Sequence, residues 1–265
     1  MEHTHDHHHH DHEHRDDHGH DDRMEWAKAL VLIGLSAYFI FNLISGNVTN
    51  YINARFIWLS YLAGGLFLLY GGYMLYTLIQ ARRGNPIEHE HDHDHDHEHA
   101  TWGILAIVAF PIAIGFFSTS TPLGADAVNG GVSQNAVGGE NGMTISSDDP
   151  MKWHVLDWLR AFGQSEDITE FEGQEASFIG FIYREPDYGT NTVMVTRFTV
   201  NCCVADASAI GLPVRGEMVA DVEQGLWVRV TGAYEISNFR GENTPVLVPQ
   251  QVELIEMPDP PYIYP

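Results

Sequence analysis

The chain has 265 residues, with 13 Lys and Arg against 36 Asp and Glu, which gives a formal charge of −23 when histidine is neutral. Its only cysteines, Cys202 and Cys203, are adjacent, which excludes the disulfide framework of a small secreted domain. Residues 120–265 carry 21 acids and seven bases, and because such a surface repels phosphate backbones we expect no nucleic-acid partner.

The chain begins with a tail, residues 1–23, in which histidines alternate with acids, and a second tract of this kind fills residues 86–99. In an extended segment alternate side chains point the same way, so neighbouring imidazoles can chelate one ion. The tracts are too polar to fold, so we predict a disordered tail and loop that bind Zn²⁺, Ni²⁺, Co²⁺ or Cu²⁺ loosely, zinc first. We expect no organic cofactor. The candidate ligands are His3, His5, His7, His8, His9, His10, His12, His14, His18, His20, His89, His91, His93, His95, His97 and His99.

Two other interpretations of the tracts stay open. They could be solvated segments of mixed charge with no physiological ligand. They could also respond to pH, because protonating all 17 histidines moves the formal charge from −23 to −6.

Residues 24–118 are predicted to form a membrane region with three apolar spans, at about 26–44, 56–79 and 101–118. About 20 helical residues cross the hydrocarbon layer, so the first two spans are long enough to cross it in contact with lipid. The third span is shorter and contains Pro111. Helices buried in a globular core are the alternative interpretation.

The basic residues beside the spans predict an orientation. Lys28 lies at the start of the first span and Arg82 and Arg83 follow the second, whereas the loop between them holds Arg55 alone. By the positive-inside rule the N-terminus and the 80–100 loop are cytoplasmic, and the C-terminal domain lies outside the cytoplasm if all three spans cross. If the third is only interfacial, that domain is cytoplasmic.

Two glycine pairs lie seven residues apart in the second span: Gly64, Gly65, Gly71 and Gly72. A spacing of seven places both pairs on one helix face, where another helix backbone can approach closely. The partner is either another helix of this chain or a helix of a second protein.

A Gly-rich linker is predicted at residues 119–147, followed by a soluble domain over 148–265. Asp149 and Pro150 suit the start of one amphipathic helix, which Gly163 ends. Beyond it the pattern predicts five strands, at residues 176–184, 192–203, 209–214, 226–236 and 245–255. The fold class is thus membrane α plus β, with an OB-like five-stranded barrel after the helices.

Cys202, Cys203 and Asp206 form a possible second metal site, provided that the strand ends there and the chain turns. Within a regular strand the two thiols point to opposite faces, so the favoured interpretation has one cysteine in the core and one beside a turn. A thiol redox module is a further possibility. His154 is a further candidate to join Asp206 or a cysteine, but a packing or surface histidine is the favoured interpretation. No nucleophile elbow, P-loop or HExxH motif occurs, so we expect a non-enzyme.

The stretches LDWLRAFG, RFTVNCCVADA and PPYIYP resemble the YcgQ-type permease-subunit family, over about residues 150–265 and more loosely across the spans. The resemblance implies an accessory subunit in a bacterial cell membrane, working with a multi-span permease encoded nearby. The histidine tracts alone add the expectation that this system takes part in divalent metal homeostasis. An envelope protein-interaction module is the alternative.

Overall fold

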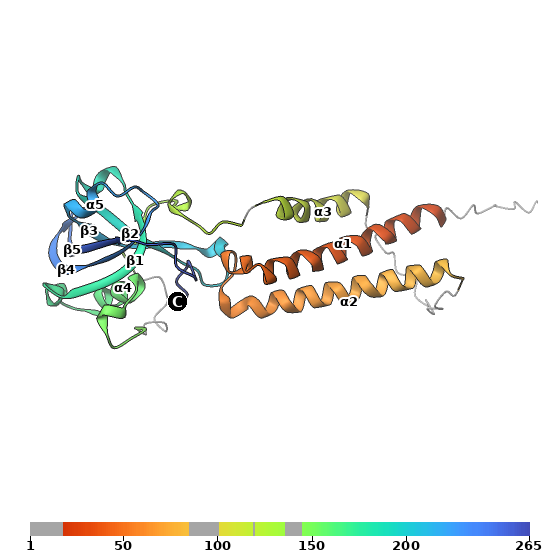
Figure 1. The fold of residues 1–265 in the computed structure, drawn as a ribbon, viewed down its shortest axis with the longest axis horizontal. Coiled ribbons are helices and arrows are strands. Elements are labelled where there is room, and N and C mark those ends of the chain that lie inside the picture. The colour runs from red at the N-terminus through yellow and green to blue at the C-terminus, as the bar shows by residue number, and fades with distance from the viewer. Residues whose placement is uncertain (1–17, 85–100, 119, 136–144) are drawn as a thin grey trace, which may run out of the picture. The chain divides into compact units, whose positions relative to one another are not determined.

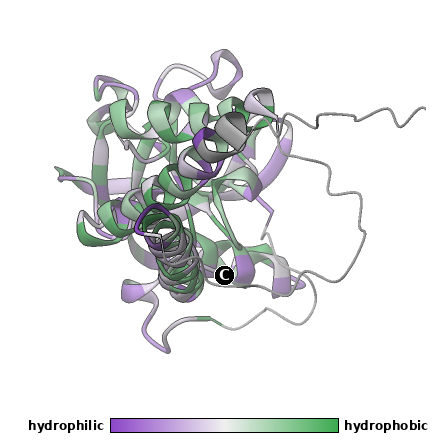
Figure 2. Cartoon of the chain, turned by 90° about the vertical axis from the view of Figure 1, so that its right-hand side faces the viewer, coloured by the Kyte–Doolittle hydropathy of each residue, from purple (hydrophilic) through white to green (hydrophobic). Residues whose placement is uncertain are grey.

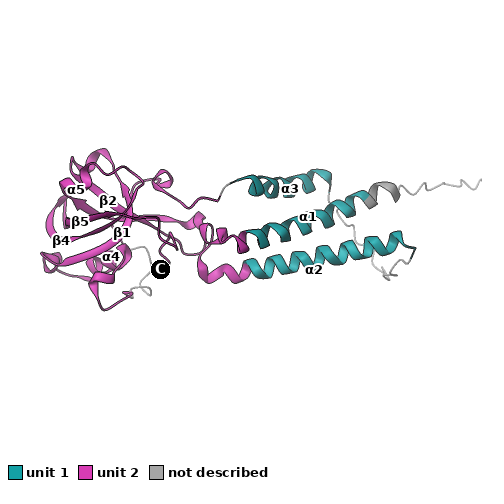
Figure 3. Ribbon diagram, in the orientation of Figure 1, with its two compact units in different colours: residues 1–41, 60–119 teal, residues 42–59, 120–265 magenta. Residues whose placement is uncertain are grey.

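The computed structural model describes residues 18–84, 101–118, 120–135 and 145–265 (Figure 1). It divides into two compact units: unit 1 contains residues 1–41 and 60–119, and unit 2 contains residues 42–59 and 120–265 (Figure 3). The short connection between the first two helices therefore belongs to the same unit as the C-terminal part of the chain.

Unit 1 consists of helical segments, and these are largely apolar. Figure 2 colours the chain by hydropathy, with hydrophobic residues green and hydrophilic residues purple. The helices are α1 (His18–Ile44), α2 (Ile57–Arg82) and α3 (Trp102–Phe117). Two stretches are long and apolar enough to cross a membrane, Arg23–Ile44 and Ala54–Arg82, whereas α3 has only 16 residues. The structure thus gives two candidate spans where the sequence predicts three. Helix α1 also begins inside the predicted disordered tail.

The two glycines of each pair in α2 have different surroundings. A Cβ atom at Gly71 would lie 3.1 Å from side-chain atoms of Leu32 and Ile33 on α1. At Gly64 it would lie 3.4 Å from Phe39, and nearby the Ser36 hydroxyl donates to the Gly64 carbonyl. A Cβ at Gly65 or Gly72 meets nothing within 4 Å. One glycine of each pair therefore packs against α1, and the other faces open space.

Unit 2 is built on five strands: β1 (Glu175–Tyr183), β2 (Thr192–Thr199), β3 (Ser208–Arg215), β4 (Trp227–Phe239) and β5 (Glu242–Leu254). They form one sheet in the order β1-β2-β3-β5-β4, and β4 also pairs with β1, so the sheet closes on itself. Only the β3–β5 pair is parallel. Gly232 lies at a register shift between β4 and β5, where an added Cβ would lie 2.1 Å from the Val248 carbonyl oxygen, so no other residue fits.

The helix predicted over 149–163 is two elements. Asp149 caps a short 3₁₀ turn, Pro150–Lys152, and α4 (Val155–Gln164) starts afresh at the N-cap His154. Helix α4 packs on the interior of the sheet through Trp158, whose ring lies 4.9 Å from that of Tyr234. A second short helix, α5 (Glu217–Ala220), separates β3 from β4.

Part of the predicted linker packs on this sheet. Val132 is 5 % exposed, and Ser133 forms a bridge to Ile210 of β3. The backbone N–H of Leu123 donates to the Tyr262 hydroxyl. We call residues 120–265 the β domain, because the segment 120–135 belongs to its packed structure.

The start of α4 depends on a buried carboxylate. Asp157 accepts hydrogen bonds from the Ser146 backbone and hydroxyl and from the His154 backbone N–H. Burial by itself raises the pKa of this carboxyl, but the hydrogen bonds from His154 and Ser146 outweigh burial and lower the pKa to about 2 from an ordinary 3.8.

We predict that replacing Asp157 with Asn lowers the stability of the β domain at neutral pH by ~1–3 kcal/mol, because one acceptor oxygen of a buried cap becomes an NH2 donor that faces other donors. Since the folded pKa is below the unfolded one, the carboxylate stabilises above pH 3.8 and loses this contribution as pH falls toward 2. Thermal unfolding from pH 7 to pH 2 should show a shallower acid decline for Asp157→Asn than for the exposed control Asp149→Asn. Equal declines would contradict the assignment.

Candidate metal centre

Cys202 and Cys203 lie in the connection between β2 and β3, which we call the cysteine turn (residues 200–207). The strand predicted over 192–203 ends at Thr199, and a 3₁₀ turn, Val204–Asp206, follows the cysteines. Cys202 is exposed and Cys203 is half-buried. The expectation of one cysteine in the core is therefore wrong, because the chain leaves the sheet before reaching either thiol.

The carboxylate of Asp206 holds the turn in shape. Its two oxygens accept hydrogen bonds from the backbone N–H groups of Asn201 (2.8 Å), Cys202 (2.8 Å) and Cys203 (3.4 Å). Burial acts to raise the pKa of this carboxyl, but the hydrogen bonds from Cys202 and its neighbours lower it, so Asp206 is ionised at neutral pH. The turn thus presents a fixed negative charge beside both thiols.

The two thiols lie close together. Their Sγ atoms are 3.6 Å apart, and with an oxygen of Asp206 they form a group of ligand atoms within 4.8 Å of one another. Two thiolates on tetrahedral zinc, each ~2.3 Å from the metal, would be ~3.8 Å apart. The spacing of the sulfur atoms therefore suits a zinc ion with little rearrangement.

The protonation of Cys202 bears on which chemistry the turn can perform. The hydrogen bond to Asp206, followed by that to Cys203, raises the pKa of the Cys202 thiol to about 11. A redox thiol needs a thiolate near neutral pH, whereas a metal can displace the proton and bind the carboxylate as well. The electrostatics of the turn thus favour a cation over thiol exchange.

The connector between α1 and α2 (residues 45–56) packs against the cysteine turn. Ile52 forms an antiparallel bridge with Cys203, and the Val204 N–H donates to the Tyr51 carbonyl over 2.9 Å. The backbone of Asn53 donates to the Cys202 carbonyl. The turn is therefore braced by backbone pairing with a segment about 150 residues earlier in the chain.

Asn53 is the main side chain of this contact. It is 7 % exposed, and its Nδ2 donates to the carbonyls of Val200 (3.2 Å) and Asn201 (2.8 Å). Sequence reasoning missed it, since its partners lie far along the chain. The one available signal was a run of polar residues, NVTNYIN, between two apolar spans.

Of the other predicted ligands, His154 does not join the cysteines. Its Nδ1 lies 3.0 Å from Asp157, and it caps α4, as the favoured interpretation of a structural histidine predicted. The tract histidines at positions 3–14 and 89–99 lie outside the described residues. His18 and His20 belong by backbone to α1.

Comparison with known proteins gives a consistent result. Residues 27–132 match the DUF1980 N-terminal domain, and residues 140–265 match the DUF1980 C-terminal domain. UPF0703 protein YcgQ of Bacillus subtilis is 24 % identical over 282 residues, covering 89 % of this chain and 98 % of the relative. A protein of Streptococcus mutans named as a subunit of a two-component membrane permease complex is 31 % identical over 97 residues, 36 % of this chain and 35 % of the relative.

Proposed function

The chain belongs to the YcgQ-type family, with a DUF1980 N-terminal and a DUF1980 C-terminal domain, and we propose that it is a non-enzymatic accessory subunit of a bacterial membrane permease complex. We propose further, from features of this chain itself, that the complex handles divalent metal ions, zinc first. The name of the Streptococcus mutans relative supports the permease role. The observation that carries the metal role is the cluster of Cys202, Cys203 and Asp206.

The pairing of the connector with the cysteine turn supports a three-span topology. If α1 and α2 both cross the bilayer, the connector lies on one side, and the β domain paired with it lies on that side too. Helix α2 then ends on the opposite side, so the chain has to cross once more before residue 120. The apolar α3 is the segment available for this crossing. Its 16 residues span ~24 Å, somewhat less than the ~30 Å hydrocarbon layer, which local thinning of the bilayer can accommodate.

Native Cys202 provides a test of this topology, because its side chain is exposed. In intact cells a membrane-impermeant maleimide should label Cys202, as expected of an extracytoplasmic β domain. In a chain without native cysteines, Gly84→Cys should react only after the membrane is permeabilised. Labelling of Cys202 only after permeabilisation would overturn the orientation.

The three apolar stretches of this chain contain no acid and no histidine, and Lys28 is their one charge, so by themselves they offer no path for an ion. Ion paths through membranes are lined by such groups. The proposal therefore assigns the path to a multi-span partner. The histidine tracts bind metal on the cytoplasmic face, and the cysteine turn binds it on the other.

We predict that affinity purification of the full chain co-purifies the multi-span permease encoded nearby.

Deletion of the gene for this chain should change the amount of cell-associated zinc. A reintroduced gene whose tract histidines are replaced by Asn should restore the normal zinc content only in part, because the cysteine turn remains. The chain with Cys202→Ser and Cys203→Ser distinguishes the redox alternative. If the cysteine variant alone loses all function and zinc content never changes, the thiol module is correct and the metal role is not.

A further inference from the structure

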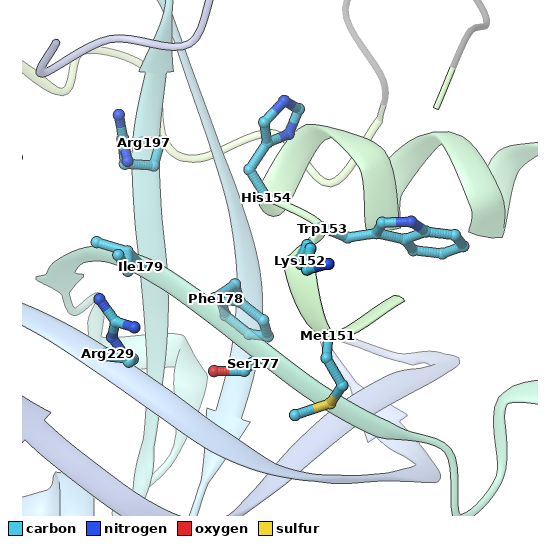
Figure 4. A pocket seen from close by; sticks show the side chains of 9 residues that line it. All are labelled: Met151, Lys152, Trp153, His154, Ser177, Phe178, Ile179, Arg197 and Arg229. Atoms are coloured by element: carbon cyan, nitrogen blue, oxygen red, sulfur yellow. The ribbon is translucent and has the colours of Figure 1, made fainter. Parts of the chain in front are cut away.

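One pocket of the β domain is lined by none of the residues of the cysteine turn. It has a volume of about 340 Å³ (Figure 4). The segment 151–154 ahead of α4 forms one wall, and β1, β2 and β4 contribute residues 177–179, Arg197 and Arg229. Pockets for small molecules begin at about this size.

The charge of the pocket is opposite to that of the domain around it. Lys152, Arg197 and Arg229 line it, which is three of the seven bases in residues 120–265, although this part of the chain holds 21 acids. None of its nine lining residues is acidic. The fold therefore gathers positive charge at one place on an acidic domain, and this local field favours an anion.

The two bases at the rim have weak partners of their own. Lys152 lies 3.3 Å from Asp149, and Arg229 lies 3.9 Å from Glu253, in both cases between side chains that are about half exposed or more. Exposed pairs of this kind contribute little free energy, so either base can turn to a ligand.

Arg197 is different, because it is 7 % exposed. One guanidinium nitrogen donates to the Pro260 carbonyl over 3.2 Å, and the group lies 5.1 Å from the centre of the Trp227 ring. Its Nε has no hydrogen-bond partner among the described residues. Burial lowers the pKa of Arg197 to about 10, so it is charged at neutral pH. A buried positive charge and a buried N–H donor without an acceptor both cost folding free energy, and a bound anion would offset both costs.

We propose that this pocket binds a small organic anion, a carboxylate or phosphate monoester joined to a short apolar group. The planar guanidinium of Arg197 matches the oxygens of either anion, and Lys152 and Arg229 add charge at the rim. Phe178 and Ile179 provide an apolar wall beside these cations. The proposal is independent of the permease and metal roles.

The test is isothermal titration calorimetry on the full chain in detergent. Four ligands are titrated separately: benzoate, phenyl phosphate, neutral benzamide and inorganic phosphate. We expect benzoate or phenyl phosphate to bind, and the stronger of the two identifies the anion. Benzamide should bind at least about tenfold more weakly, the effect of one lost charge-assisted hydrogen bond. Equal binding of benzamide, or binding of inorganic phosphate alone, would overturn the proposal.

Variants locate the site. Arg197→Gln should weaken binding about tenfold or more, and Arg240→Gln, which removes the same charge outside the pocket, should leave it unchanged. If Arg197→Gln does not fold, the double variant Lys152→Gln, Arg229→Gln changes only exposed side chains and should show a similar loss. The proposed site would be refuted if the double variant bound the anion with unaltered affinity and the Arg197→Gln protein, where it folds, did so as well. Cys202→Ser with Cys203→Ser should bind the anion normally.

Discussion

Replacing Cys202 and Cys203 together with serine is expected to weaken zinc binding at the cysteine turn by more than about 100-fold, because two thiolate ligands become poor hydroxyl ligands. The fold should survive, since one side chain is exposed and the other half-buried. The turn is held by Asp206 and by backbone pairing to the connector, and neither requires sulfur. The measurement is zinc titration of full-length protein whose tract histidines have been replaced by Asn, so that the tracts do not mask the turn.

The matched control for this experiment is His154→Asn, which removes the one histidine outside the two tracts while keeping a side chain suited to an N-cap. It should leave zinc affinity unchanged, because His154 pairs with Asp157 and not with the cysteines. A loss of affinity in this control, or none in the cysteine variant, would contradict the assignment of the site.

The pH dependence of zinc binding has a definite sign. The pKa of Cys202 is raised to about 11, so the thiol must release its proton when a metal binds. Apparent affinity should therefore fall as pH decreases, by about tenfold per pH unit for the proton that Cys202 releases. Zinc titrations at pH 6, 7 and 8 measure this slope, and a flat profile would mean that the thiols are not ligands.

Gly71→Leu is expected to destabilise the packing of α1 on α2, whereas Gly72→Leu is expected to leave it unchanged. At Gly71 even a Cβ would lie 3.1 Å from Leu32 and Ile33, so a larger side chain must push α1 and α2 apart, at a cost of ~1–3 kcal/mol or more. At Gly72 there is open space. Gly71→Leu should therefore lower the thermal midpoint in detergent and the amount of protein in membranes, and Gly72→Leu should change neither.

Gly65 and Gly72 lie on the part of α2 that faces open space. If the permease docks on this part of the helix, Gly72→Leu should reduce the yield of co-purified permease without destabilising the chain. Gly65→Leu should act in the same way, since Gly65 also faces open space, and Gly64→Leu should resemble Gly71→Leu. A normal permease yield from both Gly65→Leu and Gly72→Leu would show that docking uses another surface.

The five strands could be predicted from sequence because β-branched and aromatic runs are bounded by turn residues. The predicted 176–184 and 209–214 agree closely with β1 and β3. The end of β2 could not be predicted in this way, because the apolar pattern continues through Cys203. The strand stops at Thr199 because the chain turns to give three backbone N–H groups to Asp206. These hydrogen bonds depend on the three-dimensional path of the chain, so they leave no periodic pattern in the amino-acid sequence.

The candidate sites were predictable only in part. Cys202, Cys203 and Asp206 are close in sequence, so their grouping could be proposed, but the contact with Asn53 joins positions 148 residues apart. The anion pocket gave no sequence signal, because Arg197 and Arg229 are ordinary strand residues until the closed sheet brings β2 and β4 to either side of β1. Such groupings depend on register, which composition does not reveal.

The bridge between Ile52 and Cys203 has a mechanical consequence. The C-terminal end of α1 and the start of α2 flank the connector, and the connector pairs by backbone hydrogen bonds with the residues around the thiols. The backbone that carries the thiols and the backbone that joins the two helices therefore form one structural element, so a change in one has to be accommodated by the other.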